Sequence, residues 1–306
     1  MKGLFLPAWV RALRPAQWLK NGIVLAAFFF AWRDPGQRGN VQGWLPVVRV
    51  AVAVFCFCCV SSAVYLLNDL RDIEADRAHP IKRLRPLAAG EITVSAAVVL
   101  MAALLAAGGA SAWLLPRLFA WVAGAYVLMQ VLYTFALKRV AYVDVFVIAL
   151  GFVLRAVAGA AAVAVRISPW LLMCTFLLAL FLALCKRRHE KLLLEDEDGA
   201  EAQHRKALEG YDRYLLDIQI GITASATVVC YAIYTLAPET VQRFGTDRLG
   251  LTVPFVLFGV FRYLSLVYQH DEGGRPEKVM LTDRTLIITV MCYVAAVAAI
   301  FWSVTL

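Results

Sequence analysis

Three oxygen-bearing side chains recur at every fourth position where a long apolar run ends. Asn68, Asp72 and Asp76, the aspartate motif, would lie on one helix face and could offer oxygen atoms to one hard cation. Basic side chains follow closely in the sequence, at Lys82, Arg83 and Arg85. Mg²⁺ takes oxygen ligands and keeps several waters, so these side chains and phosphate oxygens would complete its coordination. We therefore expect a site for Mg²⁺ and a diphosphate, in which Asp72 and Asp76 are catalytic.

Two further acids in the same stretch do not share this helix face. Asp69 and Glu74 point elsewhere on a helix. Their expected partners are the neighbouring bases Arg71 and Arg77. A structural alternative for the whole stretch is a helix end that carries solvated ion pairs and no metal. We favour the metal site because acids beside a membrane span are costly unless a ligand compensates for them.

The whole chain is too apolar for a soluble domain. It has 306 residues, of which 61% are hydrophobic and 17% are charged, and its mean hydropathy is +0.70. This composition predicts an all-α, polytopic membrane protein. Nine apolar runs approach the roughly 20 residues that cross a bilayer, at residues 21–32, 46–67, 92–115, 118–137, 143–165, 169–185, 215–237, 251–268 and 286–306. We expect one membrane domain over residues 1–306, with two cytoplasmic caps near residues 68–91 and 186–214.

The basic residues predict the orientation of these helices. Most of the 30 Lys and Arg residues fall in segments on the side of the N-terminus, and loops rich in Lys and Arg stay in the cytoplasm. We therefore expect a bacterial-type inner-membrane protein whose N-terminus and active site are cytoplasmic and whose C-terminus is outside. The net charge of +8 indicates a surface that faces anionic lipid and phosphate, and no nucleic acid is expected as a partner.

A second pair of charged residues lies inside a predicted membrane span. Asp144 and Arg155 return to the same helix face, with the small residue Gly151 between them. A buried Arg in a bilayer requires a partner. One interpretation is an ion pair between helices that only stabilises the bundle. We favour the other, in which Arg155 reaches a substrate phosphate and is catalytic, with Asp144 also at the substrate.

The predicted loop after the sixth span begins with three bases. Lys186, Arg187 and Arg188 are consistent with a cytoplasmic anchor, the ordinary explanation for such a run. Glu190 lies one turn from Lys186 and could orient it through an ion pair. On that ground we assign Lys186 and Arg187 to substrate binding.

The combination of these motifs resembles the UbiA superfamily of intramembrane transferases. Four segments are similar to its decaprenyl-phosphate phosphoribosyltransferase branch, namely RPAQWLKN at residues 14–21, DRAHPIKRLRP at 76–86, GFVLRAVAG at 151–159 and KRRHE at 186–190. The resemblance covers nearly the whole chain. It implies a bundle of nine helices and Mg²⁺-dependent transfer of 5-phosphoribose from phosphoribosyl diphosphate to a polyprenyl (decaprenyl) phosphate, as part of cell-envelope biosynthesis.

One segment departs from the pattern of the prenyltransferases in this superfamily. Tyr211 and Asp212, which we assign to substrate binding, lie where those enzymes carry a second aspartate motif. Asp212 and Asp217 are five residues apart and therefore lie off a shared helix face. The departure weakens the expectation of a second metal site and of a prenyl diphosphate donor.

The acceptor decides which side chains such an enzyme needs. An aromatic carbon must lose a proton after it attacks, whereas a polyprenyl phosphate oxygen is already anionic and requires cations rather than a base. Eight bases suit this role, namely Lys20, Lys82, Arg83, Arg85, Lys138, Arg155, Lys186 and Arg187. The expected partners are phosphoribosyl diphosphate, polyprenyl phosphate and the membrane, and the sequence leaves a homo-oligomer open.

Two other functions stay open from the sequence. The first is a UbiA-type prenyltransferase with a prenyl diphosphate donor and an aromatic or lipid acceptor. The second is a transporter or lipid-binding membrane protein, in which Asp144 and Arg155 would be charges along a pathway. We rank the transporter lower because no inverted repeat is visible and the acids cluster at one surface.

Overall fold

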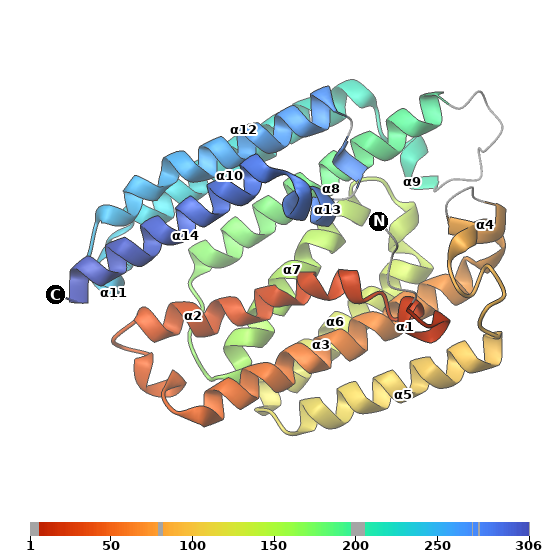
Figure 1. The fold of residues 1–306 in the computed structure, drawn as a ribbon, viewed down its shortest axis with the longest axis horizontal. Helices are drawn as coiled ribbons and strands as arrows, with labels where there is room; N and C mark the ends of the chain where they lie inside the picture. The colour runs from red at the N-terminus through yellow and green to blue at the C-terminus, as the bar shows by residue number, and fades with distance from the viewer. Residues whose placement is uncertain (1–5, 79–81, 197–205, 271, 275, 306) are drawn as a thin grey trace. The chain divides into compact units, whose positions relative to one another are not determined.

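The computed structural model describes residues 6–78, 82–196, 206–270, 272–274 and 276–305 (Figure 1). All regular secondary structure within these ranges is helical. Eight helical segments are long and apolar enough to cross a membrane: α3 (Trp44–Arg71), α5 (Val94–Trp113), α6 (Arg117–Phe135), α7 (Val143–Ala162), α8 (Pro169–Asp196), α10 (Arg213–Leu236), α12 (Val253–Gln269) with the preceding 3₁₀ helix η5 (Arg248–Thr252), and α14 (Arg284–Thr305). These helices confirm the predicted all-α class and a protein with several membrane spans.

The first predicted span differs from the others. It consists of the 3₁₀ helix η1 (Pro15–Leu25), followed directly by the short α-helix α2 (Ala26–Arg33). The eight candidate spans do not include this segment, so the structure does not confirm the predicted count of nine. Eight crossings would leave both termini on one side of the membrane, whereas nine would separate them. The predicted orientation therefore stays a prediction.

The described chain divides into two compact units, which we treat separately. Unit 1 contains the described residues of 1–28, 43–138 and 154–165, and unit 2 those of 29–42, 139–153 and 166–306. The shorter elements are α1 (Ala8–Ala12), η2 (Arg38–Val41), α4 (Ile73–Ala78), η3 (Lys82–Leu84), η4 (Leu137–Arg139), α9 (Lys206–Glu209), α11 (Pro238–Phe244), η6 (Glu272–Gly274) and α13 (Pro276–Thr282). The division cuts α2 after Phe28 and α7 after Val153. The expectation of one domain stays a prediction.

Unit 1 is organised around α3, which packs mainly on α5 and also on η1 and α6. Its contact with α5 depends on Gly108, because a Cβ there would lie 2.9 Å from Cγ2 of Val60. Cys56 lies in the same contact and donates a hydrogen bond of 3.3 Å from Sγ to the Gly108 carbonyl. Small residues of this kind let membrane helices approach closely. Toward α6, the rings of Phe57 and Tyr126 lie 5.2 Å apart.

The helix η1 places every third side chain against its neighbours in unit 1, because side chains three residues apart align in a 3₁₀ helix. Trp18 Nε1 donates to Ser62 Oγ over 3.0 Å, and Asn21 and Val24 are fully buried. The carbonyl oxygen of Val24 lies against Gly159 of α7, where a Cβ would come within 2.0 Å. Only glycine permits this close approach of the two backbones.

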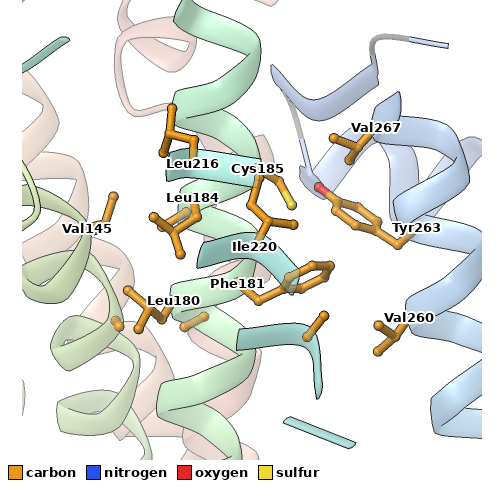
Figure 2. Packing of buried hydrophobic residues seen from close by; sticks show 14 of the residues in the cluster. Val145, Leu180, Phe181, Leu184, Cys185, Leu216, Ile220, Val260, Tyr263 and Val267 are labelled. Carbon is orange, nitrogen blue, oxygen red and sulfur yellow. The ribbon is translucent and has the colours of Figure 1, made fainter. Parts of the chain in front are cut away.

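Unit 2 has an apolar core around α8 (Figure 2). Figure 2 shows Phe181 and Leu184 of α8 between Val145 of α7 on one side and Tyr263 of α12 on the other. The rings of Phe181 and Tyr263 meet edge to face with their centroids 5.6 Å apart, a favourable geometry for aromatic pairs. Ile220 of α10 is fully buried in the same cluster. This core supports the helix that carries three of the basic residues discussed above.

The first residues of the predicted cap at 186–214 belong to a membrane-span helix. Helix α8 continues to Asp196, so Lys186, Arg187 and Arg188 lie within it and do not begin a loop. That expectation was wrong because both arginines are buried among partners on neighbouring segments and do not end the helix. In the other cap, α3 continues to Arg71 and is followed by α4 and η3. Residues 79–81 and 197–205 of the predicted caps lie outside the described residues.

Candidate functional site

The aspartate motif lies where α3 ends and α4 begins, in unit 1. The helical repeat is preserved across this junction, because the Asp72 N–H donates to the Asn68 carbonyl over 3.0 Å and the Asp76 N–H donates to the Asp72 carbonyl over 2.8 Å. The three side chains therefore keep the spacing of one helix face. Asp76 is buried, whereas the Asp72 side chain is 38% exposed. Asp72 is thus the carboxylate that a ligand from outside can reach.

Each carboxylate of the motif binds a basic side chain of unit 1. Lys138 Nζ contacts both carboxylate oxygens of Asp72, at 2.9 and 2.6 Å. Arg85 Nη1 donates to Asp76 Oδ2 over 2.5 Å. Both bases were predicted to bind substrate phosphate, and here they neutralise the acids that were predicted to bind metal.

Asp69 is a further buried acid at this site, and its partners differ from those predicted. Arg14 forms an ion pair with Asp69 Oδ1, and Arg85 Nη1 lies 3.1 Å from the same oxygen. The predicted partners Arg71 and Arg77 contact an aromatic ring of α6 and a backbone carbonyl. The prediction was wrong because it considered only bases that are close in the sequence, whereas the observed partners reach Asp69 through the fold.

The donor atoms of the aspartate motif suit Mg²⁺. Asn68 Nδ2 donates to the Val64 carbonyl over 3.1 Å, which orients the amide and leaves Oδ1 as the atom that a cation would take. With the carboxylates of Asp72 and Asp76, the motif offers only hard oxygen ligands. In the part of the chain that the structure describes, no three His, Cys, Asp or Glu side chains form a ready metal site. Mg²⁺ binding would therefore require the basic side chains to release these acids and phosphate oxygens to complete the coordination.

Arg155 is buried in α7, within unit 1. Its Nε donates to Asn21 Oδ1 over 2.9 Å, and its Nη2 donates to the Tyr126 hydroxyl over 2.7 Å. Asn21 Nδ2 in turn donates to Ser61 Oγ over 3.3 Å. Asp144, which was expected to form one group with Arg155, bonds to other residues. Their shared helix face did not bring them together because each has partners on neighbouring segments.

Asp144 belongs to a buried group of unit 2 that we call the Asp144 network (Asp144, Arg187, Glu190 and Tyr211). Arg187 Nε donates to Asp144 Oδ2 over 2.6 Å, and the Tyr211 hydroxyl donates to Oδ1 over 2.6 Å. The side chains of Arg187 and Asp144 are 1% and 0% exposed, and Glu190 forms a second ion pair with Arg187. The Tyr211 oxygen also accepts the Tyr142 N–H over 2.8 Å. Burial, together with the bond to Asp144, raises the pKa of Tyr211, so its hydroxyl remains a donor.

The bases beside Arg187 have different surroundings. Arg188 Nε donates to Asp217 Oδ1 over 2.7 Å, and its guanidinium lies 4.1 Å from the centroid of the Tyr268 ring. The Lys186 side chain is 41% exposed, with Nζ 4.0 Å from the Glu190 carboxylate. This is the ion pair expected from their spacing. Of the three consecutive bases, Lys186 is therefore the one that a substrate can reach.

Asp212 caps a helix. Its Oδ1 accepts the Leu215 N–H over 2.9 Å at the start of α10, and its side chain is exposed. Asp217 lies further along α10 and binds Arg188. The two acids engage separate partners, as their five-residue spacing predicts.

The predicted site residues fall into two groups, one in each unit. Unit 1 contains Lys20, Asn68, Asp72, Asp76, Lys82, Arg83, Arg85, Lys138 and Arg155, and unit 2 contains Asp144, Lys186, Arg187, Tyr211 and Asp212. Lys20 and Lys82 are partly buried and Arg83 is exposed. Their roles with substrate stay predictions.

Sequence reasoning assigned no site role to three residues of these groups. Asn21, at the start of an apolar run, and Tyr126, inside another, are polar residues, and this signal could have identified them because buried polar groups in a membrane need partners. Arg14 gave no comparable signal, since it lies in a segment rich in charge.

Comparison with known proteins gives consistent results. Residues 23–282 match the model of the UbiA prenyltransferase family. A relative from Mycolicibacterium smegmatis named decaprenyl-phosphate phosphoribosyltransferase is 35% identical over 96% of this chain and 92% of its own. A relative of the same name from Corynebacterium glutamicum is 35% identical over 93% of this chain and 84% of its own. The solved structure of a UbiA homolog from Archaeoglobus fulgidus bound to GPP and Mg²⁺ has a TM-score of 0.71 at 18% identity, over 97% of this chain and 99% of that one. The chain belongs to the UbiA prenyltransferase family.

Proposed function

We propose that this protein transfers 5-phosphoribose from phosphoribosyl diphosphate to a polyprenyl phosphate such as decaprenyl phosphate, and releases diphosphate. The observation that carries the proposal is the 35% identity, over 96% of the chain, to a relative named decaprenyl-phosphate phosphoribosyltransferase. The aspartate motif and the bases around it supply the groups that this reaction needs.

The chemistry centres on C1 of the ribose. The bond from C1 to the diphosphate oxygen breaks, and the departing diphosphate keeps the electron pair. An oxygen of the acceptor phosphate forms the new bond to C1. This oxygen is already anionic, so no side chain has to remove a proton. Positive charge that develops on C1 is tolerated because the negative charge of the leaving group is neutralised.

Unit 1 provides that neutralisation in our proposal. Asn68, Asp72 and Asp76 would bind Mg²⁺, which stabilises negative charge on a leaving phosphate oxygen. The fold neighbour solved with Mg²⁺ supports the use of a divalent metal. Lys138 and Arg85 contact two of these acids and are positioned to bind phosphate oxygens beside the metal.

A prenyl diphosphate donor is the main alternative, since the A. fulgidus homolog was solved with GPP. The arrangement of Asp212 and Asp217 supports the phosphoribosyl donor instead. One caps α10 and the other binds Arg188, so neither is arranged with the other as a second metal site. This arrangement does not favour a prenyl diphosphate donor, because that donor would use a second aspartate motif.

The test uses purified protein in detergent with radiolabelled phosphoribosyl diphosphate and decaprenyl phosphate, with and without Mg²⁺. We expect a labelled lipid product and diphosphate, and loss of both when a chelator is added. In parallel, labelled geranyl diphosphate is offered with aromatic and lipid acceptors. Product only in the second assay would replace our proposal with the prenyltransferase.

We further infer an inner-membrane protein whose N-terminus and aspartate motif face the cytoplasm, from the excess of Lys and Arg on that side. Single cysteines introduced at residues 34–43 or 239–247 of a cysteine-free variant should react with an impermeant reagent on intact cells. Cysteines at residues 82–91 should react only after lysis. The reverse pattern would contradict the orientation.

A further inference from the structure

We propose that Lys138 and Arg85 are internal counter-ions, which bind Asp72 and Asp76 until Mg²⁺ and the substrate diphosphate arrive together and then transfer to the phosphates. The inference rests on the proposed function for its ligand. It concerns the state of the site before any ligand binds, and it assigns these two bases a role in the order of binding as well as in substrate recognition.

The acids around the aspartate motif form ion pairs with bases of unit 1. Among the described residues, the carboxylates of Asp69, Asp72 and Asp76 contact Arg14, Arg85 and Lys138. The Asp69 and Asp76 side chains are 4% and 5% exposed. Buried carboxylates without compensation are strongly destabilising. Arg14 and Arg85, which contact the two buried acids, are therefore needed for stability when no metal is bound. A metal ion that arrives alone must compete with Arg85 at Asp76 and with Lys138 at Asp72.

Lys138 is the more direct competitor of a metal ion. Its Nζ lies 2.9 and 2.6 Å from the two oxygens of Asp72, and these are the atoms that a metal would take. Lys138 is buried, and Asp72 is the most exposed carboxylate of the three. An ion that approaches Asp72 from outside therefore meets an acid whose negative charge is already neutralised.

Arg85 differs because it bridges two acids. Its Nη1 lies 2.5 Å from Asp76 and 3.1 Å from Asp69, and Arg14 also binds Asp69. Arg85 can thus release Asp76 while Asp69 keeps the second arginine as a partner. The buried Asp69 is a positioning residue in this scheme, because its ion pair with Arg85 keeps that base beside the motif.

The diphosphate supplies what the metal alone lacks. Its oxygens would complete the coordination of Mg²⁺. They would also accept hydrogen bonds from the ammonium group of Lys138 and the guanidinium group of Arg85 once these groups leave the acids. Lys138 and Arg85 then do not have to remain beside Mg²⁺ without an anionic partner. Metal and diphosphate should therefore bind with positive coupling, and each should promote the binding of the other by the same factor.

The experiment measures Mn²⁺ binding to the full-length protein in detergent, from the electron paramagnetic resonance signal of free Mn²⁺, with and without phosphoribosyl diphosphate. We expect weak binding of Mn²⁺ alone to the unmodified protein, and tighter binding with phosphoribosyl diphosphate. Lys138→Met should bind Mn²⁺ alone about tenfold more tightly or better, because one charge-assisted competitor is removed. The additional tightening by phosphoribosyl diphosphate should shrink in that variant.

Two control variants separate charge from shape. Lys138→Arg retains the cation and should resemble the unmodified protein, whereas Arg139→Met removes the exposed base next in the chain and should change nothing. If Lys138→Met does not give a monodisperse protein, Arg85→Gln tests the same exchange at Asp76, with the same direction of change.

Unchanged or weaker binding of Mn²⁺ alone by the folded variant would overturn the counter-ion role, even if the unmodified protein transfers phosphoribose. Failure of the unmodified protein to bind phosphoribosyl diphosphate, with or without Mn²⁺, would overturn the proposed function instead. The two failures are thus distinguishable.

Discussion

The aspartate motif of unit 1 and the Asp144 network of unit 2 contain similar side chains in different surroundings. In unit 2, Asp144 and Arg187 are 0% and 1% exposed, and the carboxylate of Asp144 binds both Arg187 and Tyr211. In unit 1, Asp72 is 38% exposed, and both of its oxygens bind one lysine. A fully buried acid with two different partners has no low-cost alternative arrangement. A partly exposed acid that is bound to one side chain can exchange that side chain for a ligand.

The comparison suggests a division of roles among residues that were all predicted to bind the metal or the substrate. Asp144, Arg187 and Tyr211 satisfy one another, which favours a role in fixing α7, α8 and the segment before α10. Asp72 and Lys138 remain open to exchange. Variants of the two groups should therefore affect different measurable quantities.

The largest effect is expected from the aspartate motif on turnover. Asp72→Asn or Asp76→Asn should lower the rate of phosphoribosyl transfer by about ten-thousandfold or more, equal to about 5 kcal/mol, because a metal ligand is weakened. The matched control is Glu74→Gln, an exposed acid of α4, which should keep near-normal activity. Near-normal turnover by either Asn variant at saturating Mg²⁺ would show that the residue is not a ligand.

The next effect concerns stability in unit 2. Arg187→Met should lower the free energy of unfolding by roughly 3 kcal/mol, because it leaves Asp144 buried without its cation. Denaturant titration in mixed micelles measures this value. The double variant Asp144→Asn with Arg187→Met should recover part of the loss, and Lys138→Met should cost much less because Asp72 is exposed. Equal losses at Lys138 and Arg187 would remove the distinction between the two groups.

The exposed base of α8 should affect ligand binding rather than folding. Lys186→Met should weaken the binding of phosphoribosyl diphosphate by about 2 kcal/mol, the value of one charge-assisted contact. Affinity for polyprenyl phosphate should change little if the two phosphates occupy separate subsites. Calorimetric titration with each ligand checks this, with Lys191→Met as a neighbouring control. Unchanged affinity for phosphoribosyl diphosphate would assign Lys186 to the cytoplasmic anchor.

The smallest effect is expected at a peripheral ion pair. Arg262 donates two hydrogen bonds to Asp283, and Asp283 also accepts the Leu286 N–H at the start of α14. The bonds from Arg262 hold the pKa of Asp283 below its usual range. Its contribution to stability is therefore present above the unfolded pKa of about 4 and is lost as the pH falls through the lower folded pKa.

The comparison of unmodified protein with Asp283→Asn isolates this contribution. The difference in unfolding free energy should be under about 1 kcal/mol near neutral pH and should vanish in acid. A difference that persists below the folded pKa would mean that Asp283 acts through its shape and not through its charge.

The repeat of the aspartate motif could be predicted because it depends on local helix geometry. The backbone bonds of Asp72 and Asp76 continue that geometry across the junction of α3 and α4. The partners of Asp69 and Arg155 could not be predicted, since Arg14, Asn21 and Tyr126 come from distant segments. Pairing between distant segments depends on packing, and the sequence spacing of charges does not encode it.

The extent of α8 was also misjudged from the sequence. A run of bases after an apolar segment normally indicates that a span has ended. Here Arg187 and Arg188 are buried through Asp144 and Asp217, and the helix continues to Asp196. Hydropathy alone cannot reveal such compensation, because it assigns each residue a value without its partner.

The tight winding of η1 increases the length that its residues extend along the helix axis. A 3₁₀ helix rises about 2.0 Å per residue, compared with about 1.5 Å in an α-helix. The 11 residues of η1 therefore extend about 22 Å rather than about 17 Å. The 8 residues of α2 add about 12 Å of contour length. The total contour length is about 34 Å, compared with about 29 Å for the same residues at α-helical pitch and a hydrocarbon thickness of about 30 Å.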